Sequence, residues 1–448
     1  MRFLLEVVDE VRRAVEGQCA VIVRMSMTEL EPGGQSMLDA IYIARALEKA
    51  GVNLLNLSNG TLETYWKTVT PSGTPRGVNT ELSAQLKQTV HIPVGVIGRN
   101  CEPWAAEQVL ELGRTDVVYM ARALLCDPDF PNKAQRGDVQ DIRPCIGCTD
   151  CITHAHGTQI RCTMNPYAGR ETEVPQAVDS PKRVLVIGGG AAGLQAAATA
   201  AHRGHQVTLL EASEQLGGQM FLAGVPIAKQ DITQGAKYLI HRAIKAGVEI
   251  RCSVQADEKI IRSYAPDAVI LATGGQPIVP GFLKAAKQLV SAWDVLAGHV
   301  TTGQNIVVIG GGAVGCETAE FLIHPQNDRH PRGKSVTLIE MMDDIMKGNR
   351  SYARSLLVQR MQEKGCRILV DTKVESVCGD ELTYSCDGKM TTLTGIDTVV
   401  CALGVYPNNS LSETVKKLGI PLYIAGDAMK TGRIYEAITS GETLASQI

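Results

Sequence analysis

Residues 182–204 read KRVLVIGGGAAGLQAAATAAHRG, an apolar strand that runs into a glycine loop and then into an alanine-rich helix. The loop carries Gly188, Gly190 and Gly193 at the spacing G-x-G-x-x-G. At this spacing the first glycine permits a tight turn, the second lets a pyrophosphate approach the backbone, and the third lets the helix pack on the strand. The N–H groups at the start of the helix attract phosphate oxygens. The stretch therefore predicts a dinucleotide-binding Rossmann unit.

A second copy of this pattern begins at residue 305 and reads NIVVIGGGAVGCETAEFL. Its three glycines are Gly310, Gly312 and Gly315. In each copy the next predicted strand ends at a carboxylate, Glu211 in the first and Glu340 in the second, which can accept hydrogen bonds from ribose hydroxyls. The charge of Glu340 would also repel a 2′-phosphate, and Met341 and Met342 follow it in place of arginine. NADH is therefore favoured over NADPH in the second unit.

Two such units in one chain resemble the flavoproteins that bind FAD in one unit and NAD(P)H in the other. The segments ATG at 272–274, ALG at 402–404 and YIAGDA at 423–428 are similar to those of that architecture, and so is EASEQLGGQ at 211–219. The resemblance implies FAD contacts at Gly188, Gly190, Ala192, Gly193, Glu211, Gly218, Gln219, Lys229 and Asp427. It implies NAD contacts at Gly310, Gly312, Gly315 and Glu340.

The disulfide reductases of this architecture use two cysteines spaced by two or four residues. Residues 182–448 contain no such pair, because the six cysteines there are dispersed. Electrons are therefore expected to leave the FAD by another route.

The first 137 residues alternate short apolar strands with amphipathic helices, a pattern that indicates four βα units with a parallel sheet. The predicted strands are 20–26, 53–57, 93–97 and 116–120. The predicted helices are 2–15, 38–50, 81–90 and 103–113. Several of these strands end in polar or glycine residues, where barrel enzymes place their active sites.

Four of the 13 cysteines cluster in the sequence, at Cys145, Cys148, Cys151 and Cys162. Three cysteines separated by two residues each can bind one face of a cubane, and a more distant fourth can complete it, so we expect a [4Fe–4S] cluster. A tetrahedral zinc site is the open alternative. His154 and His156 lie between the third and fourth cysteines and are expected to be solvated loop residues rather than ligands.

The composition excludes several classes of partner. The formal net charge is −3, and no basic cluster supports binding to nucleic acid or to an anionic membrane. No apolar run has the length of a membrane-spanning helix, and the cytoplasm is the expected location. A small-molecule substrate is expected, and a homo-oligomer is compatible with the sequence.

A barrel, a cysteine cluster and two Rossmann units in this order resemble the trimethylamine dehydrogenase / 2,4-dienoyl-CoA reductase branch of the old-yellow-enzyme family. The resemblance is carried by MRFLLEVVDEVRRAV at 1–15, VIVRMS at 21–26, VIGRN at 96–100, YMARALLCDPDFPNKAQRG at 119–137 and RPCIGC at 143–148. It implies that Arg24 approaches the flavin N1/C2 carbonyl; a salt-bridged strand residue is the alternative for this arginine. It also implies that the loops with Gly98, Arg99, Ala121 and Arg122 surround the FMN phosphate.

The chain also departs from this family. The relatives place four barrel strands before the segment that matches Met1, so we expect only the C-terminal half of a TIM-type (β/α)₈ barrel, with an open sheet edge. Alanine replaces glycine before Arg122. The relatives' catalytic histidine has no counterpart in GTLETYWKTVTPSGTPRG at 60–77. Tyr65 is the candidate proton donor there, and a packing role is its alternative.

These features predict an α/β chain with five segments. They are a partial FMN-binding barrel (1–140), the cluster and linker (141–180), the first part of the FAD domain (181–300), the NAD(P)H domain (301–404) and the returning FAD segment (405–448).

The expected activity is an electron relay from NADH through FAD and [4Fe–4S] to FMN that reduces an activated C=C bond in an enoyl or dienoyl thioester or an enone. Oxidative C–N cleavage of a methylated amine is one alternative. An electron-transfer subunit or remnant without its own substrate site is another. A separate polypeptide that supplies the first barrel strands is an expected partner, and FMN is expected once the barrel is complete.

Overall fold

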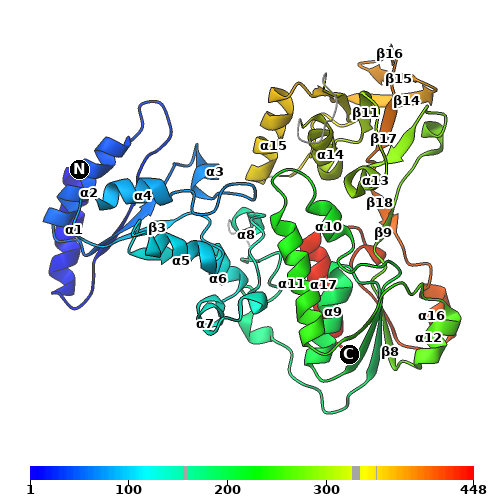
Figure 1. Cartoon of the computed structure of the whole chain (residues 1–448), viewed down its shortest axis with the longest axis horizontal. Coiled ribbons are helices and arrows are strands. Elements are labelled where there is room, and N and C mark those ends of the chain that lie inside the picture. The colour runs from blue at the N-terminus through cyan, green and yellow to red at the C-terminus, as the bar shows by residue number, and fades with distance from the viewer. Residues whose placement is uncertain (155–158, 325–332, 350) are drawn as a thin grey trace. The chain divides into compact units, whose positions relative to one another are not determined.

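The computed structural model describes residues 1–154, 159–324, 333–349 and 351–448. The chain divides into two compact units, Met1–Cys151 and Ile152–Ile448, and each is described by itself (Figure 1).

The N-terminal unit is built on a parallel sheet whose strands follow in chain order, β1 (Ile22–Ser26), β2 (Leu54–Ser58), β3 (Val94–Ile97) and β4 (Val117–Tyr119). Its helices are α1 (Arg2–Val15), α2 (Met37–Lys49), α3 (Tyr65–Thr68), α4 (Thr80–Lys87), α5 (Pro103–Glu111), α6 (Arg122–Cys126), α7 (Phe130–Arg136), η1 (Val139–Asp141) and α8 (Asp150–Thr153). The division between the two units falls within α8. The apolar side chains of β2 and α2, with Leu55, Leu57, Ala44 and Leu47 fully buried, form its main core. The four βα units expected from the sequence are confirmed.

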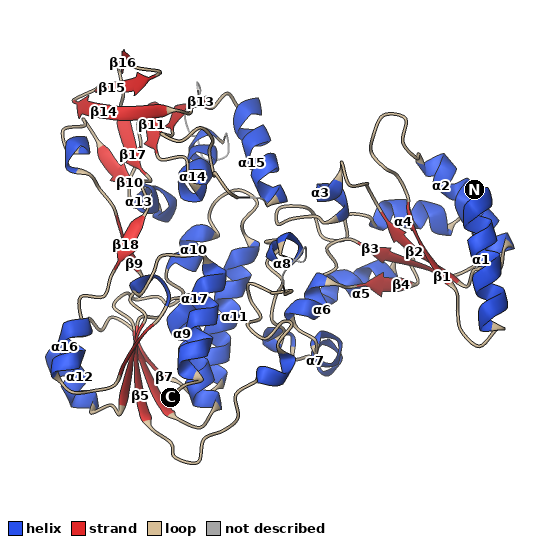
Figure 2. Cartoon of the chain, turned by 180° about the vertical axis from the view of Figure 1, so that it is seen from behind, coloured by secondary structure: helices blue, strands red, loops and turns tan. Residues whose placement is uncertain are grey.

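The second unit contains two Rossmann domains. The first Rossmann domain has a parallel sheet in the order β19-β8-β5-β6-β7. Its strands are β5 (Arg183–Ile187), β6 (Gln206–Leu210), β7 (Glu249–Arg251), β8 (Ala268–Leu271) and β19 (Leu422–Ile424). Because β19 pairs with β8, the last segment of the chain returns to this domain. Helices α9 (Ala191–His202), α11 (Asp231–Lys245) and α17 (Ile434–Ala445) cover one face, and α12 (Glu258–Tyr264) and α16 (Ser412–Lys417) the other (Figure 2).

The second Rossmann domain repeats this plan with the order β10-β17-β11-β12-β13. Its strands are β10 (Leu289–Ser291), β11 (Asn305–Ile309), β12 (Ser335–Ile339), β13 (Arg367–Leu369) and β17 (Thr398–Cys401). Helices α13 (Ala292–Ala297), α14 (Ala313–Ile323) and α15 (Tyr352–Glu363) pack on one face. An antiparallel sheet of β14 (Thr372–Cys378), β15 (Glu381–Cys386) and β16 (Lys389–Leu393) packs on the other.

Shorter elements complete this unit. They are α10 (Gln219–Ala223), η2 (Glu171–Glu173), η3 (Gly281–Leu283), η5 (Gly426–Ala428), and the paired strands β9 (Gly275–Pro277) and β18 (Val405–Pro407), which connect the two Rossmann domains. In the described part of the chain, no helix has both the length and the apolar character needed to cross a membrane.

Helices α9 and α17 pack unusually closely because a glycine lies at their contact. A Cβ atom added to Gly441 would lie 2.3 Å from the carbonyl oxygen of Ala192. Ala196 and Ala197 of α9 are completely buried, so small side chains continue along this helix. The close packing fixes α9, the helix that follows the first glycine loop.

We predict that Gly441→Ala destabilises the first Rossmann domain by roughly 1–3 kcal/mol, because the new methyl group must displace helical backbone. Urea unfolding followed by circular dichroism measures the change. Gly281→Ala is the matched control, since a methyl group there meets no atom within 4 Å. Equal stability of the two variants would show that the helices can separate at little cost.

Candidate functional site

Each glycine of the first loop has the environment that its expected role requires. Gly188 has φ +108°, and a Cβ there would lie 2.3 Å from the carbonyl oxygen of Ala272, so the turn needs glycine. A Cβ on Gly190 would meet no atom within 4 Å, which leaves room for a ligand against the backbone. A Cβ on Gly193 would lie 1.9 Å from the carbonyl oxygen of Gly188, so only glycine lets α9 pack this closely on the strand.

The second loop has the same geometry. Gly310 has φ +106°, a Cβ on Gly312 would meet open space, and a Cβ on Gly315 would lie 1.8 Å from the carbonyl oxygen of Gly310. Both loops therefore present open backbone at the start of a helix, where a pyrophosphate can bind.

In both domains a glutamate accepts a hydrogen bond from the backbone of the glycine loop. Oε2 of Glu211 accepts a hydrogen bond from the Gly189 N–H at 2.6 Å, and Oε2 of Glu340 accepts one from the Gly311 N–H at 2.6 Å. The second oxygen of Glu340 accepts from the Met342 N–H at 2.8 Å. Both carboxylates are thus held at the ends of β6 and β12, the strand ends where ribose is bound in this fold.

A cavity of about 610 Å³ lies on the first glycine loop. It brings together seven of the expected FAD contacts: Gly188, Gly190, Ala192, Glu211, Gly218, Gln219 and Asp427. Gly193 does not line it, because this glycine faces the strand. A Cβ on Gly218 would lie 3.1 Å from the Cα of Gly190, so the 211–219 stretch folds directly over the second glycine.

The cavity reaches the second Rossmann domain at Val314 and Glu317 of α14. Lys229 does not line the cavity, but its Nζ lies 2.8 Å from Oε1 of Glu317. Only 12% of the Glu317 side chain is exposed, so the ion pair is largely shielded from water. Lys229 therefore affects the cavity by forming an ion pair with Glu317, which lines the cavity, and does not line the cavity itself.

Sequence reasoning missed several lining residues. Trp293, Asn408 and Arg433 also line the cavity, from segments far apart in the chain. Asp427 accepts a hydrogen bond from the Gly432 N–H at 2.9 Å, which places the loop before α17 beside it. The only sequence signal was that Trp293 is one of three tryptophans.

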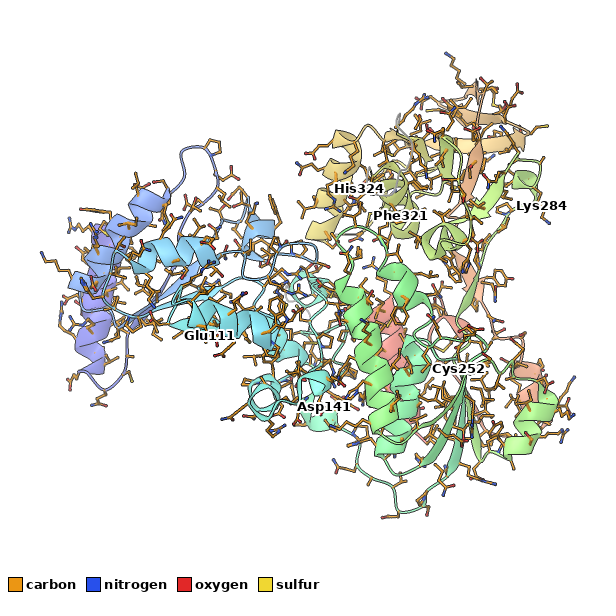
Figure 3. The ribbon with its side chains drawn as sticks, in the orientation of Figure 1. Glu111, Asp141, Cys252, Lys284, Phe321 and His324 are labelled. Carbon is orange, nitrogen blue, oxygen red and sulfur yellow. The ribbon has the colours of Figure 1, made fainter. Side chains whose placement is uncertain are left out.

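No cysteine lines this cavity among the residues that the structure describes. Cys252 follows β7 in the first Rossmann domain (Figure 3). Burial raises the pKa of Cys316 to about 12 and that of Cys366 to about 11. These two thiols stay protonated at neutral pH and are poor nucleophiles.

In the N-terminal unit the carboxyl ends of four parallel strands meet at one edge of the sheet. Arg24 lies on β1 and donates from Nη2 to Oγ of Ser58, the last residue of β2, at 3.1 Å. No acidic group lies within ion-pair distance of Arg24 in the described part of the chain. Arg24 is an exposed residue and can therefore contact a ligand.

Two residues in a row after β3 have positive φ, Gly98 at +149° and Arg99 at +52°. Such a turn directs successive N–H groups into a concave surface that suits an anion. The Arg99 side chain is 7% exposed, and its Nη1 donates to the carbonyl oxygen of Pro71 at 2.7 Å. Its guanidinium therefore holds a loop, and phosphate contacts at this position are expected from the backbone.

Arg122 has a similar structural role at the start of α6, where Ala121 is the N-cap residue. Its Nη1 donates to the carbonyl oxygen of Thr70 at 2.8 Å. The N–H of Ser72 in turn donates to the carbonyl oxygen of Gly147 at 2.9 Å. The segment 70–72 thus connects the ends of β3 and β4 to the loop that carries the cysteines.

The cysteine loop is also anchored at its start. The buried carboxylate of Asp127 accepts hydrogen bonds from the Arg143 N–H at 2.8 Å and from Nζ of Lys133 at 2.7 Å. Sγ of Cys126 donates to the carbonyl oxygen of Pro144 at 3.3 Å. The backbone directly before Cys145 is therefore held in place.

Two cysteines of the expected cluster, Cys145 and Cys148, lie on this loop, and a third, Cys151, lies on α8, which follows it. Cys145 and Cys148 are half-buried and Cys151 is buried. Gly147 and Thr149, on either side of Cys148, have φ of +64° and +61°, so the backbone curls between the cysteines. This curl fits a ligand loop that wraps around a compact group.

The fourth cysteine, Cys162, is half-buried and belongs to the second unit. Within the described residues, no three His, Cys, Asp or Glu side chains converge as a metal site, so the ligand set remains a prediction from the spacing. His154 is half-buried, and His156 lies outside the described residues.

Tyr65 is the first residue of α3 and is half-buried. Its role as a proton donor remains a prediction.

Known proteins match both units. Residues 1–141 match the NADH:flavin oxidoreductase / NADH oxidase family, and residues 172–432 match the pyridine nucleotide-disulphide oxidoreductases. The NADH oxidase of Thermoanaerobacter brockii is 37% identical over an aligned length of 460 residues, and the alignment covers 100% of this chain and 69% of that protein. The cinnamate reductase of Clostridium sporogenes is 30% identical, with 100% and 69% covered.

The solved structure of 2-naphthoyl-CoA reductase with 2-naphthoyl-CoA superposes with a TM-score of 0.92 at 27% identity, and the match covers 100% of this chain and 68% of that one. The chain thus spans about two thirds of the length of these relatives. The resemblance to the old-yellow-enzyme family drawn from the sequence is confirmed. The chain belongs to the NADH:flavin oxidoreductase / NADH oxidase family and is an NADH-dependent flavin oxidoreductase.

Proposed function

We propose that the chain uses electrons from NADH, relayed through FAD and a [4Fe–4S] cluster to FMN, to reduce an activated C=C bond. The observation that carries the proposal is the cavity that extends from the first glycine loop to Glu317 on α14. A flavin on the first loop and a nicotinamide bound to the second domain can meet there. Since no cysteine lines the cavity in the described residues, the electrons need an outlet other than a dithiol.

The residues of the second unit hold the two nucleotides. Open backbone at Gly190 and Gly312, each at the start of a helix, binds the pyrophosphates. Glu211 and Glu340 accept hydrogen bonds from the ribose hydroxyls. When bound, FAD accepts hydride from NADH and releases electrons one at a time.

The [4Fe–4S] cluster is the proposed acceptor of the electrons that leave FAD. Cys145, Cys148 and Cys151 have the spacing of a cubane site, and their loop is fixed to the N-terminal unit through Ser72 and Asp127. Cys162 is the proposed fourth ligand. A loop anchored in this way keeps its donor sulfurs at a constant position relative to the strand ends.

The strand ends of the N-terminal unit are the proposed FMN site. Successive N–H groups at Gly98 and Arg99, with those at Ala121 and Arg122, would bind the phosphate. Arg24 would stabilise the negative charge that develops at N1/C2 of the reduced ring.

The substrate class is proposed from the relatives. Cinnamate reductase and 2-naphthoyl-CoA reductase are named for substrates with conjugated double bonds. Reduction of such a bond consumes one NADH and one proton per C=C.

A polypeptide partner is proposed for the N-terminal unit. Within the described sheet β1 and β4 each pair on one side only, and such edges can pair with further strands. Phe3 and Val7 on α1 are also exposed and apolar. A partner that pairs with the edges would complete the surroundings of the FMN.

The cluster assignment predicts that protein purified without oxygen contains about four irons and four sulfides per chain. Cys148→Ala should remove this iron while FAD remains reducible by NADH, because the cavity lies in the other unit. Cys19→Ala, which changes an exposed cysteine outside the motif, is the control. Stoichiometric zinc without iron would refute the cluster.

Glu340 predicts a preference for NADH over NADPH in kcat/KM for flavin reduction. Glu340→Gln should reduce this preference roughly tenfold, because an amide oxygen can keep the hydrogen bond to Gly311 while the repulsion of a 2′-phosphate disappears. Stopped-flow reduction measures both coenzymes. Asp343→Asn, an exposed acid near the same strand end, should leave the ratio unchanged. A wild-type preference for NADPH would show that Glu340 does not select the coenzyme.

The partner proposal predicts that the chain alone reduces artificial dyes with NADH but contains well below one FMN. Added polypeptide that pairs with the sheet edges should raise FMN content and cinnamate or enoyl-thioester reduction together. Full FMN and C=C reduction in the isolated chain would contradict the need for a partner. Reduction of the oxidised protein by a methylated amine would favour C–N cleavage, and dye reduction without any carbon substrate would favour an electron-transfer subunit.

A further inference from the structure

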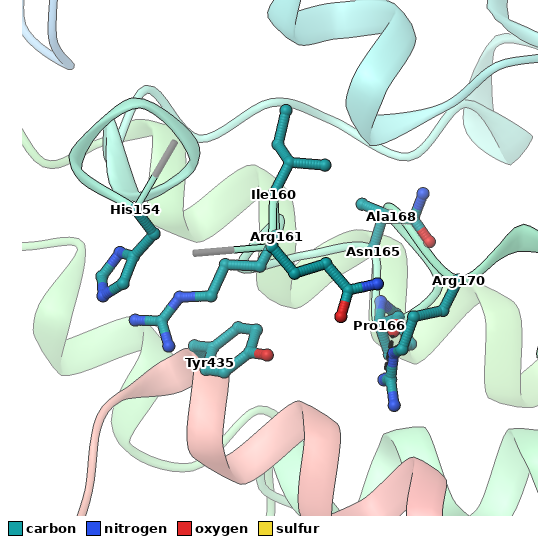
Figure 4. Close-up of a pocket in the computed structure, with 9 residues that line it drawn as sticks. His154, Ile160, Arg161, Asn165, Pro166, Ala168, Arg170 and Tyr435 are labelled. Carbon is teal, nitrogen blue, oxygen red and sulfur yellow. Dashed lines mark hydrogen bonds between the residues drawn. The ribbon is translucent and has the colours of Figure 1, made fainter. Parts of the chain in front are cut away.

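A second cavity, of about 260 Å³, lies in the second unit (Figure 4). It shares no lining residue with the flavin cavity. Its walls come from the segment 159–170, from the residue that follows α8 and from the start of α17. The lining residues are His154, Gln159, Ile160, Arg161, Asn165, Pro166, Ala168, Arg170 and Tyr435.

The lining is positively charged. Two guanidinium groups and an imidazole face the cavity, and no carboxylate lines it among the residues that the structure describes. Arg170 is held in place by a hydrogen bond from Nη2 to the carbonyl oxygen of Pro166 at 2.6 Å, and its Nη1 lies 3.5 Å from Oε2 of Glu173, which does not line the cavity. A small cavity with two fixed arginines favours an anion.

The cavity also has flat and apolar walls. The Cζ atom of the Arg161 guanidinium lies 4.0 Å from the centre of the Tyr435 ring, in a cation–π contact, and Figure 4 shows the two side chains next to each other. Pro166 and Ala168 are buried and add apolar surface. Asn165 is only 4% exposed, and its Oδ1 accepts a hydrogen bond from the Tyr167 N–H at 3.1 Å, which fixes this wall.

We propose that this cavity binds a small planar carboxylate, with the carboxylate on Arg161 and Arg170 and the flat body against Tyr435. Planar carboxylates match the fork of the guanidinium group. The volume lies just below the usual range for small-molecule sites and is too small for a second dinucleotide, so a ligand of about one ring is expected. The proposal does not depend on the flavin assignments.

Such a ligand would strengthen the contact between the 159–170 segment and α17. These two parts already meet at the Arg161–Tyr435 contact and at the hydrogen bond from the Tyr167 hydroxyl to Glu442. Because the segment contains Cys162 and α17 packs on α9, binding here would stabilise the chain around the flavin domain.

The test is calorimetric titration of the purified, flavin-loaded chain with benzoate, acetate and inorganic phosphate. Benzoate should bind most tightly and raise the unfolding temperature. Arg161→Gln and Arg170→Gln should each weaken benzoate binding about tenfold or more. Tyr435→Leu should reduce the preference for benzoate over acetate, because the ring is lost and the charges stay. Arg262→Gln, an exposed arginine on α12 that pairs with Glu258, is the matched control and should bind like the wild type.

Three results would overturn the proposal or its choice of ligand. Unchanged benzoate affinity in Arg161→Gln and Arg170→Gln would place the binding elsewhere and overturn the proposal. Tighter binding of phosphate than of benzoate would overturn the planar-carboxylate assignment. Should Arg161→Gln lose its flavin or its circular dichroism signal, Arg161→Lys keeps the charge without the fork, and an affinity equal to the wild type in that variant would also overturn it.

Discussion

The contact between Gly193 and Gly188 is the constraint on which the rest of the C-terminal unit depends. At this point helix and strand approach so closely that a Cβ would lie 1.9 Å from a carbonyl oxygen. The approach directs the start of α9 at the open backbone of Gly190, and so creates an anion site from main-chain groups alone. The same contact recurs between Gly315 and Gly310, which explains how one chain presents two similar nucleotide sites.

The position of α9 is secured from the other side by α17. Gly441 lets the helices touch, and the buried Glu442 accepts hydrogen bonds from Tyr167, Gln195 and Thr199. A buried carboxylate is tolerable only when its oxygens have donors, and here two separate segments supply them, the one with Tyr167 and α9 with Gln195 and Thr199. The segment after the last cysteine, the first Rossmann helix and the C-terminal helix therefore meet at one acid. Any change that moves this acid would disturb both the flavin cavity and the arginine-lined cavity.

In the N-terminal unit, two arginine side chains hold a loop in place. The sequence resemblance assigned Arg99 and Arg122 to a phosphate, whereas their guanidinium groups hold the carbonyl oxygens of Pro71 and Thr70. They shape the loop 70–72, which in turn holds Gly147 between two of the cysteines. The backbone at Gly98 and Arg99, with positive φ, is left to provide the anion-binding surface. One set of side chains thus positions both the proposed FMN site and the cysteine loop.

Much of this protein was determined by the sequence itself. The range of α1, Arg2–Val15, and the four strands of the N-terminal unit followed from apolar periodicity, and the strand ends differ from the prediction by only one or two residues. Helix α4 ends at Lys87 rather than near residue 90, where a turn leads to Pro93, which cannot continue a helix. The glycine spacing and the two glutamates were readable because these interactions are local.

The remainder was decided only by the tertiary structure, because it depends on residues that are distant in the chain. Trp293, Asn408 and Arg433 join the flavin cavity through three separate segments, and Lys229 reaches it through Glu317. Tyr435 and Arg161 are 274 positions apart in the sequence, counted as 435 − 161, and still form a cation–π contact at 4.0 Å. No periodicity records such contacts, since they arise when sheets order their strands and helices pack on them. The sequence therefore determined the chemistry that each segment can offer, and the packing determined which segments offer it together.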